Sequence, residues 1–499
     1  MVLGLPLLLA AHAAAADGDG VVAPTAAQLR WMQDEIGAIG HFNMGTFQAC
    51  GIGADAADAD AGLALPPAST FAPTNVQPEQ WIKALASAGV TRAVLVVSHG
   101  CGFNTFPSRT NLTLADGRHF VYNYSVRNSP WKGGQGDIAQ EFVEACRAHK
   151  IRPGFYHGSV NNAFLNLHSG KIGRPSGIAG QAVITQDEYE QILLLNLRQL
   201  WTDYGPLAEV WFDGGIPNGF ANKLWALHQE LQPDAVAFQG PTVGKSPNLI
   251  RWAGTEGGHV KYPFWSADTA KKPLGSPDAG AGSPNGTFFA PGEADTCFQG
   301  GRKEDGLAAP YGGCWFYNKG MVPKSLAELV SSYHDSVGKN AFWLIDWTPT
   351  QEGILRPDHI ERYKELGDWL HECYGVPIAE AAMGGLEQQD GAMSFTVPPG
   401  HQVDRVMLQE DLTDGQRVRG FEVMQGGAVL LSGSSIGNKY IGLLNETLPA
   451  GATVTLKITE QVGAAKVAKF AGYNCSRAPS ASGCSLQQDF AYLLRPHFC

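Results

Sequence analysis

The stretch Glu209-Val210-Trp211-Phe212-Asp213-Gly214-Gly215 indicates the fold more clearly than any other part of the chain. Its apolar residues predict a buried strand, and the two glycines predict a sharp turn directly after it. Asp213 therefore stands at the C-terminal end of a strand, where parallel α/β proteins carry their reactive groups. An Asp in this position can also serve only as a turn or helix-cap residue. Asp213 is thus a candidate functional residue that needs support from the rest of the chain.

Strand-like runs alternate with helical patterns from about residue 39 to residue 346. The helical segments begin at capping boxes such as Thr185–Glu188 and Ser325–Glu328. This alternation predicts a closed parallel (β/α)8-like barrel. Its strand candidates are Ile39–Phe42, Ala93–Val97, Gly154–His157, Glu209–Phe212, Ala235–Gln239, Leu249–Trp252, Gly313–Phe316 and Phe342–Ile345.

Two later regions depart from this alternation. Residues 267–312 are rich in Gly, Pro, Ala and Ser without any helical or strand period, and we expect a functional loop there. After about residue 378, short alternating runs predict a C-terminal antiparallel β-sandwich. These runs are Ala392–Val397, Arg405–Leu408, Val418–Val423, Ala428–Leu431 and Thr453–Ile458.

The N-terminus and the overall charge limit the location and the partners of the protein. Residues 1–16 form a short apolar run that ends in alanines, which predicts a secretory signal peptide; an Ala-rich disordered start is the alternative. No stretch approaches the roughly 20 apolar residues of a membrane span. The net charge of −11 argues against nucleic acid as a partner. We therefore expect residues 1–16 to be a signal, 17–377 the barrel, and 378–499 the sandwich with a Cys-containing tail.

Sequons and cysteines agree with an extracellular location. Nine cysteines suggest disulfides and at least one unpaired thiol, with Cys475–Cys484 as the first candidate pair and Cys146 as a buried thiol. Candidate N-glycosylation sites are Asn111, Asn123, Asn285, Asn445 and Asn474.

Metal and serine chemistry find little support in the sequence. The chain has no His-Glu-x-x-His, Cys-x-x-Cys, EF-hand or phosphate-loop motif, so we expect no metal and no cofactor. Gly433-Ser-Ser-Ile-Gly437 matches the nucleophile elbow of serine hydrolases, but the residues that follow predict a strand where that motif needs a helix.

Carboxylates provide the stronger chemical hypothesis. Glu256 follows the strand candidate that ends at Trp252, and it also leads into two glycines. Strands four and six of one barrel open on the same face, so we expect Asp213 and Glu256 to meet there as the carboxyl pair of a glycoside hydrolase. Asp346, a third acid at a strand end, is expected to be structural. Aromatic residues at neighbouring strand ends could stack on a sugar or simply pack the core; these are Tyr156, Trp211, Trp252, Trp265 and Trp315.

The chain resembles the retaining α-L-fucosidases of glycoside hydrolase family 29 over roughly residues 38–460. The Trp211-Phe-Asp213-Gly run is the most specific part of the likeness, and the sandwich is similar to that of the α1,3/1,4-linkage-specific branch. The motifs that carry the resemblance are His41–Phe47, Val126–Lys132, Gly136-Asp137, Phe155-Tyr156, Trp211–Gly214, Arg251-Trp252, Glu256, Lys324–Leu326, Gly338–Asn340, Val403–Leu412 and Gly433–Gly437.

The resemblance implies a secreted enzyme that removes terminal fucose from oligosaccharides or glycoproteins. It assigns Asp213 as the nucleophile and Glu256 as the acid/base, with Glu293 as a rival acid/base. The residues it places around the fucose are His41, His99, Tyr156, Trp211 and Trp315.

Some family positions differ in this chain. His99-Gly100-Cys101 replaces a His-His pair, Phe106 stands in place of a Trp, and Cys50–Gly53 stands near the position of a Glu-Trp-Gly run. An inactive, lectin-like fucose-binding relative therefore remains an alternative, as does a retaining barrel glycosidase for another sugar such as galactose.

Overall fold

A computed structural model describes residues 19–48, 50, 65–216, 219–240, 248–269, 280–300, 313–382 and 392–475. The expected signal segment 1–16 and Cys484 lie outside these ranges.

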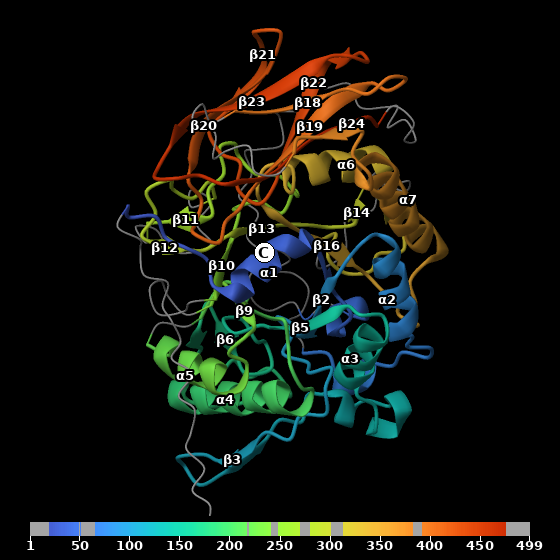
Figure 1. Ribbon diagram of the computed structural model, residues 1–499. Coiled ribbons are helices and arrows are strands. Elements are labelled where there is room, and N and C mark those ends of the chain that lie inside the picture. The colour runs from blue at the N-terminus through green and yellow to red at the C-terminus, as the bar shows by residue number, and fades with distance from the viewer. Residues whose placement is uncertain are drawn as a thin grey trace, which may run out of the picture.

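The first part of the chain forms a closed barrel of eight parallel strands, as the sequence predicted. Neighbouring strands follow the order β1-β16-β13-β10-β9-β8-β5-β2 (Figure 1). Long strands such as β2 and β16 are buried along their whole length, which is typical of a parallel sheet covered by helices. The strands are β1 (Ile36–Gly40), β2 (Arg92–Ser98), β5 (Arg152–His157), β8 (Glu209–Trp211), β9 (Val236–Phe238), β10 (Leu249–Trp252), β13 (Gly292–Thr296) and β16 (Phe342–Trp347).

The helices around the barrel begin where the sequence indicated. Thr185 and Ser325 each accept a hydrogen bond from the N3 backbone of the helix they cap, so both predicted capping boxes are present. The surrounding helices are α2 (Pro78–Ser87), α3 (Ile138–Ala148), α4 (Gln186–Asp203), α5 (Ala221–Leu231), α6 (Leu326–Asp335) and α7 (Pro357–Tyr374).

Helix α1 (Ala26–Asp34) closes one end of the barrel and lies across its middle in Figure 1. The ring of Trp31 stacks on Phe342 at 4.3 Å, and its Nε1 donates to Glu209 at 3.2 Å. Gln28 donates to the carbonyl of Leu249 at 2.8 Å. Glu209 and Leu249 begin their strands, so α1 covers the N-terminal end and leaves the C-terminal strand ends for the functional site.

The seventh barrel strand differs from the prediction. Residues 313–316 form turns, and β13 (Gly292–Thr296) takes the barrel position instead, inside the segment expected to be a loop. The sequence Gly-Glu-Ala-Asp-Thr has no apolar run because its acidic side chains, Glu293 and Asp295, are buried against polar partners.

The barrel part of the chain also contains short strands and short 3-10 helices. The small antiparallel pairs are β3 (Asn111–Thr113) with β4 (His119–Val121), β6 (Leu167–His168) with β7 (Lys171–Ile172), β11 (Ala267–Asp268) with β12 (Phe288–Phe289), and β14 (Gln299–Gly300) with β15 (Val322–Pro323). The short 3-10 helices are η1 (Met44–Thr46), η2 (Ala68–Thr70), η3 (Val126–Asn128) and η4 (Trp131–Gly134).

The C-terminal part consists of two four-stranded antiparallel sheets, which confirms the predicted β-sandwich. Figure 1 shows it on the side of the barrel opposite α4 and α5. One sheet has the order β17-β24-β19-β22 and the other β18-β23-β20-β21. The strands are β17 (Ala379–Glu380), β18 (Ala392–Thr396), β19 (Val403–Glu410), β20 (Val418–Gln425), β21 (Ala428–Gly433), β22 (Tyr440–Leu448), β23 (Thr453–Gln461) and β24 (Val467–Tyr473).

The segment Gly433–Gly437, which matched the serine hydrolase motif, lies between β21 and β22 and contacts the barrel. Gly433 ends β21 and Tyr440 begins β22, so no helix follows Ser435. Its hydroxyl donates to the carbonyl of Phe264 at 2.6 Å. Ser435 therefore joins the two parts of the molecule, and the absence of the required helix excludes a nucleophile elbow.

Three disulfides lie in the described residues: Cys50–Cys101, Cys297–Cys314 and Cys373–Cys475. The expected pair Cys475–Cys484 was wrong, because Cys475 pairs with Cys373 at the end of α7. The Cα atoms of Cys373 and Cys475 are 4.7 Å apart. Cys146 is a buried free thiol on α3, as expected.

Candidate active site

Asp213 follows β8 and is held by a tyrosine. The Tyr156 hydroxyl donates to Asp213 Oδ2 at 2.8 Å. Gly214 and Gly215 both have positive φ, 70° and 84°, a backbone conformation that a turn can adopt without strain only at glycine. The hydrogen bond favours the charged carboxylate and fixes its orientation.

Trp211 packs against Tyr156. Its ring stacks on Tyr156 with the centroids 5.0 Å apart and on Phe238 at 4.0 Å. Its Nε1 donates to Glu293 Oε1 at 2.8 Å. Trp211 is therefore part of the barrel interior and acts on the site through Tyr156.

Glu256 stands in the loop after β10 and is exposed. Trp315 Nε1 donates to its Oε2 at 3.3 Å. The neighbouring Cys297–Cys314 disulfide ties Trp315 to the end of β13. Glu256 thus accepts a hydrogen bond from Trp315, and the disulfide fixes the segment that carries Trp315.

His41 is a buried histidine close enough to Asp213 and Glu256 for both charges to affect its pKa. Its Nδ1 lies 2.7 Å from Asp346 Oδ1, and its ring centroid lies 5.3 Å from that of Trp315. Burial lowers the pKa of His41 to about 3, although the charges of Asp213 and Glu256 both act to raise it. Burial also raises the pKa of Asp346 well above its usual range. Burial therefore disfavours the charged form of each partner of this pair.

His99 completes this group of side chains. Its ring stacks on Tyr156 at 5.7 Å and meets Phe316 edge-on at 5.0 Å. Just beyond it, Cys101 forms the disulfide with Cys50, which joins the loops that follow β1 and β2. The structure therefore brings together the predicted residues His41, His99, Tyr156, Asp213, Glu256 and Trp315.

Glu293, the rival acid, is fully buried inside the barrel. Burial, and next the neighbouring Glu209, raise the pKa of Glu293 well above its usual range. Arg92 Nη1 lies 3.7 Å from Glu209 Oε2. Glu293, Glu209 and Arg92 thus form one buried group of charged residues near the barrel end that α1 closes.

Asp295 was not predicted as a site residue. It is 6% exposed, and its Oδ1 accepts a hydrogen bond from Trp252 Nε1 at 2.8 Å. Burial raises the pKa of Asp295 well above its usual range, and the charges of Glu256 and Asp213 contribute to this rise. A signal was present in the sequence, because Glu293 and Asp295 are two residues apart and so share one face of a strand.

Trp265 lies away from this group. The Arg419 guanidinium lies 4.8 Å from its ring centroid, so Trp265 packs where the barrel meets the sandwich.

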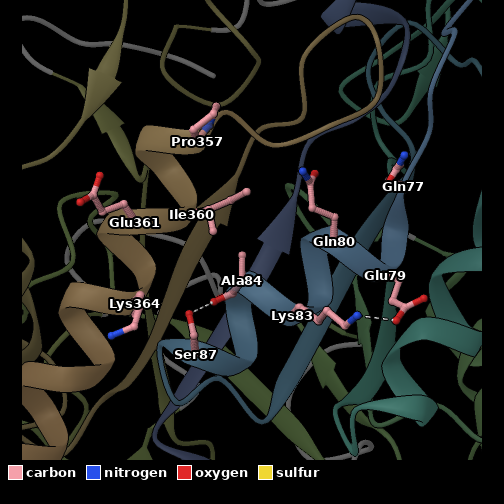
Figure 2. A pocket seen from close by; sticks show the side chains of 10 residues that line it. All are labelled: Gln77, Glu79, Gln80, Lys83, Ala84, Ser87, Pro357, Ile360, Glu361 and Lys364. Carbon is pink, nitrogen blue, oxygen red and sulfur yellow. Dashed lines mark hydrogen bonds and ion pairs between the residues drawn. The ribbon is translucent and has the colours of Figure 1, made fainter.

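A groove of about 730 Å³ lies on the outside of the barrel between α2 and α7 (Figure 2). Its lining includes an exposed ion pair, Lys83 with Glu79 at 2.7 Å, and a hydrogen bond from Ser87 to the carbonyl of Ala84. It contains none of the predicted site residues, and these internal pairings favour an ordinary solvated helix surface.

Within the described residues, no group of three or more His, Cys, Asp or Glu side chains could hold a metal ion. The same part of the chain has no helix long and apolar enough to cross a membrane.

Two carboxyl groups at the C-terminal strand ends of a barrel, set among aromatic side chains, define the protein as a barrel glycoside hydrolase. Known α-L-fucosidases are similar to this chain. The α-L-fucosidase family profile matches residues 59–246. A putative α-L-fucosidase 1 of Oryza sativa is 27% identical, with the match covering 80% of this chain and 74% of that protein. The α-L-fucosidase 1 of Arabidopsis thaliana is 24% identical, covering 84% of this chain and 81% of that protein.

A crystal structure of a putative α-L-fucosidase from Bacteroides thetaiotaomicron superposes with a TM-score of 0.75 at 25% identity. The match covers 91% of this chain and 99% of the bacterial one. The chain is thus similar in sequence and in fold to known α-L-fucosidases.

Proposed function

We propose that this protein is a secreted, exo-acting α-L-fucosidase that hydrolyses terminal α1,3- or α1,4-linked L-fucose with retention of configuration. One observation carries the proposal: the His41 ring lies 6.4 Å from the ring of Tyr156, which binds Asp213, and 5.3 Å from the ring of Trp315, which binds Glu256. Two carboxyl groups that face one small space have the arrangement that glycoside hydrolysis requires.

The two carboxyl groups take different roles because their surroundings differ. Asp213, ionised and oriented by the Tyr156 hydroxyl, attacks the anomeric carbon and forms an ester as the glycosidic C–O bond breaks. Glu256 gives its proton to the departing oxygen. It then takes a proton from water, whose oxygen displaces Asp213 and releases fucose. Buried Glu293 is bonded to Trp211, so Glu256 is the better placed acid.

The buried His41–Asp346 pair, whose charged forms burial disfavours, suits a site for an uncharged sugar. A neutral imidazole can exchange hydrogen bonds with hydroxyl groups without adding charge beside Asp213. Trp315 and Phe316 lie 5.3 and 5.2 Å from the His41 ring. Apolar ring surface favours the methyl group of fucose over the polar hydroxymethyl group of galactose.

The linkage preference rests on the sandwich. Its Val403–Leu412 and Gly433–Gly437 segments resemble the α1,3/1,4-specific branch. The second segment contacts the barrel through Ser435 and Phe264, so the sandwich has a fixed position from which to shape a branched acceptor.

Secretion is supported by the apolar segment 1–16, the disulfides and the sequons. Asn111, Asn123, Asn285 and Asn445 are exposed and could carry glycans. Asn474 is half-buried, and its Nδ2 donates to the carbonyl of Gln402 at 3.1 Å, which disfavours its modification. Loss of residues 1–16 from protein collected from the medium, together with a mass decrease after enzymatic deglycosylation, would support this location. Recovery only inside the cell, with the N-terminus intact, would overturn it.

The catalytic proposal is tested by measuring free L-fucose released from oligosaccharides with defined α1,2, α1,3, α1,4 and α1,6 linkages. Nuclear magnetic resonance of the first product identifies its anomer. We expect α-fucose from the α1,3 and α1,4 substrates. Fucose binding without release would favour a lectin-like protein, release of galactose from α-galactosides would favour a different sugar, and an initial β-anomer would exclude retention.

A further inference from the structure

The loop that carries Glu256 is fastened to β13 at both of its ends. The backbone N–H of Ala253 donates to the carbonyl of Glu293 at 2.7 Å, and that of Gly258 donates to the carbonyl of Asp295 at 3.0 Å. Next to this second bond, Gly257 and Thr296 form an isolated antiparallel bridge. The position of Glu256 therefore depends on β13.

Asp295 holds this loop with its side chain as well as its backbone. Its Oδ1 accepts from Trp252 Nε1 at 2.8 Å, and Trp252 is the last residue of β10 before the loop begins. A single residue thus anchors the start of the loop through its carboxyl group and the end through its carbonyl. It is almost fully buried, so water competes little for the Trp252 hydrogen bond.

We propose that Asp295 is a positioning residue for the general acid of the reaction: it fixes the loop that aims Glu256 at the glycosidic oxygen. This inference rests on the proposed fucosidase function. Asp295 acts through Trp252 and the loop backbone, while Asp213 and Glu256 carry out the bond-making and bond-breaking steps.

The charge state of Asp295 fits this role. Like charges lie around it: Glu256 from the loop after β10, Asp213 from the loop after β8, and Glu293 on β13 itself, while on β16 Asp346 is bound to His41. Burial, and next the charges of Glu256 and Asp213, raise the pKa of Asp295 well above its usual range, which favours its uncharged form. A neutral carboxyl group still accepts the Trp252 N–H through its carbonyl oxygen, and it adds no negative charge beside the nucleophile.

A misplaced acid has a recognisable kinetic effect. A poor leaving group such as a sugar hydroxyl needs a proton as the bond breaks, whereas an activated aryl leaving group needs little help. A shift of Glu256 by about 1 Å can cost about 10²-fold in the proton-dependent reaction. Loosening the loop should therefore slow natural glycosides far more than activated ones.

The test compares Asp295→Leu with Asp295→Asn, because leucine removes the acceptor while asparagine keeps a neutral one of the same shape. For Asp295→Leu we expect kcat/KM to fall about 10²-fold on a fucosyl oligosaccharide and less than about tenfold on a dinitrophenyl fucoside. Asp295→Asn should recover most of the oligosaccharide activity.

Two further variants separate positioning from general damage. Trp252→Phe removes the N–H donor and keeps a smaller aromatic ring, and it should show the same leaving-group selectivity even if Asp295→Leu fails to fold. Glu293→Gln is the matched control, since this buried acid on the same strand bonds Trp211 through its side chain; any loss should fall equally on both substrates.

The outcomes also distinguish this inference from the proposed function. If the unmodified enzyme releases no fucose from either substrate, the proposed function is wrong. If the unmodified enzyme is active, but Asp295→Leu and Trp252→Phe slow both substrates equally, or Asp295→Asn is no better than Asp295→Leu, Asp295 has no role in positioning the acid.

Discussion

At the residue scale, the roles of the carboxyl groups follow from what each one contacts. Asp213 accepts a hydrogen bond from a tyrosine at 2.8 Å, Glu256 is exposed beside Trp315, and Glu293 and Asp295 are buried. Four acids close in sequence or space thus occupy different surroundings, and these differences are the basis for the different roles that we propose for Asp213 and Glu256.

Replacement of Asp213, the proposed nucleophile, gives the most direct prediction. Asp213→Asn should lower kcat by several orders of magnitude, because an amide cannot form the fucosyl ester. Fucose binding, measured by calorimetry, and Tm should stay close to those of the unmodified protein because the change is nearly isosteric. A loss below about tenfold would remove Asp213 from this role.

The acid/base is identified by chemical rescue. Glu256→Ala should slow oligosaccharide hydrolysis far more than hydrolysis of activated aryl fucosides. Azide should accelerate the variant and give α-fucosyl azide, because the small anion replaces water on the fucosyl-enzyme. Glu293→Ala serves as the comparison; rescue of that variant, without rescue of Glu256→Ala, would reverse the assignment.

At the element scale, the sequence predicted those strands whose apolar side chains follow a regular pattern. Seven of the eight barrel strand candidates overlap observed strands, since buried parallel strands are rich in apolar residues. β13 was not predicted because its acidic residues Glu293 and Asp295 are buried. Their hydrogen-bond donors, Trp211 and Trp252, lie on other strands. Those partners are more than 40 residues away and cannot be read from the local sequence. Asp295 was missed as a site residue because the segment was expected to be a loop, so the spacing of Glu293 and Asp295 on one strand face was not used.

The Cys297–Cys314 disulfide gives an element-scale prediction. Cys297 follows β13 and Cys314 precedes Trp315, so the disulfide holds the Trp315 ring beside Glu256 and His41. The double variant Cys297→Ser/Cys314→Ser should lower kcat/KM for fucosides about tenfold, while the barrel stays folded by circular dichroism. The single thiol variant Cys146→Ser should leave kcat/KM nearly unchanged. An unaltered kcat/KM in the double variant would mean that Trp315 keeps its place without the disulfide.

The acids near α1 predict how stability depends on pH. Burial raises the pKa of Glu209 to about 7 from its ordinary value of 4.5, and Glu293 shifts in the same direction. A group whose pKa is raised by folding stabilises the native state below its unfolded pKa, and this contribution is lost as pH rises through the folded value. The contribution of these two acids to stability should therefore decline between about pH 4.5 and pH 7, opposite in sign to that of buried histidines such as His41, whose pKa is lowered. Glu293→Gln should make this decline shallower in a series of Tm measurements; an identical slope of Tm against pH would mean that these acids do not set it.

At the scale of the whole molecule, the barrel and the sandwich are joined by hydrogen bonds and one disulfide. Asn438 N donates to Asn340 Oδ1 at 2.7 Å, and Ser435 donates to the Phe264 carbonyl. Cys373 and Cys475 are 102 residues apart, and their pairing could not be predicted because it depends on how the two parts dock. The sequence thus indicated both parts of the molecule, whereas their connection became visible only in the structure.

The Cys373–Cys475 disulfide leads to a prediction about cooperative unfolding. By closing a long loop it restricts the unfolded chain, a contribution of about 4–5 kcal/mol in the chain-entropy description. Cys373→Ser/Cys475→Ser should therefore lower the Tm of the sandwich and split the single unfolding transition in calorimetry into two. Fucoside hydrolysis at 25 °C should stay within about twofold, because the residues around Asp213 and Glu256 all come from the barrel. One transition that moves without splitting would show that noncovalent contacts, such as those at Asn340 and Phe264, are enough to couple the two parts. A parallel loss of activity would show instead that the sandwich holds the barrel site in shape.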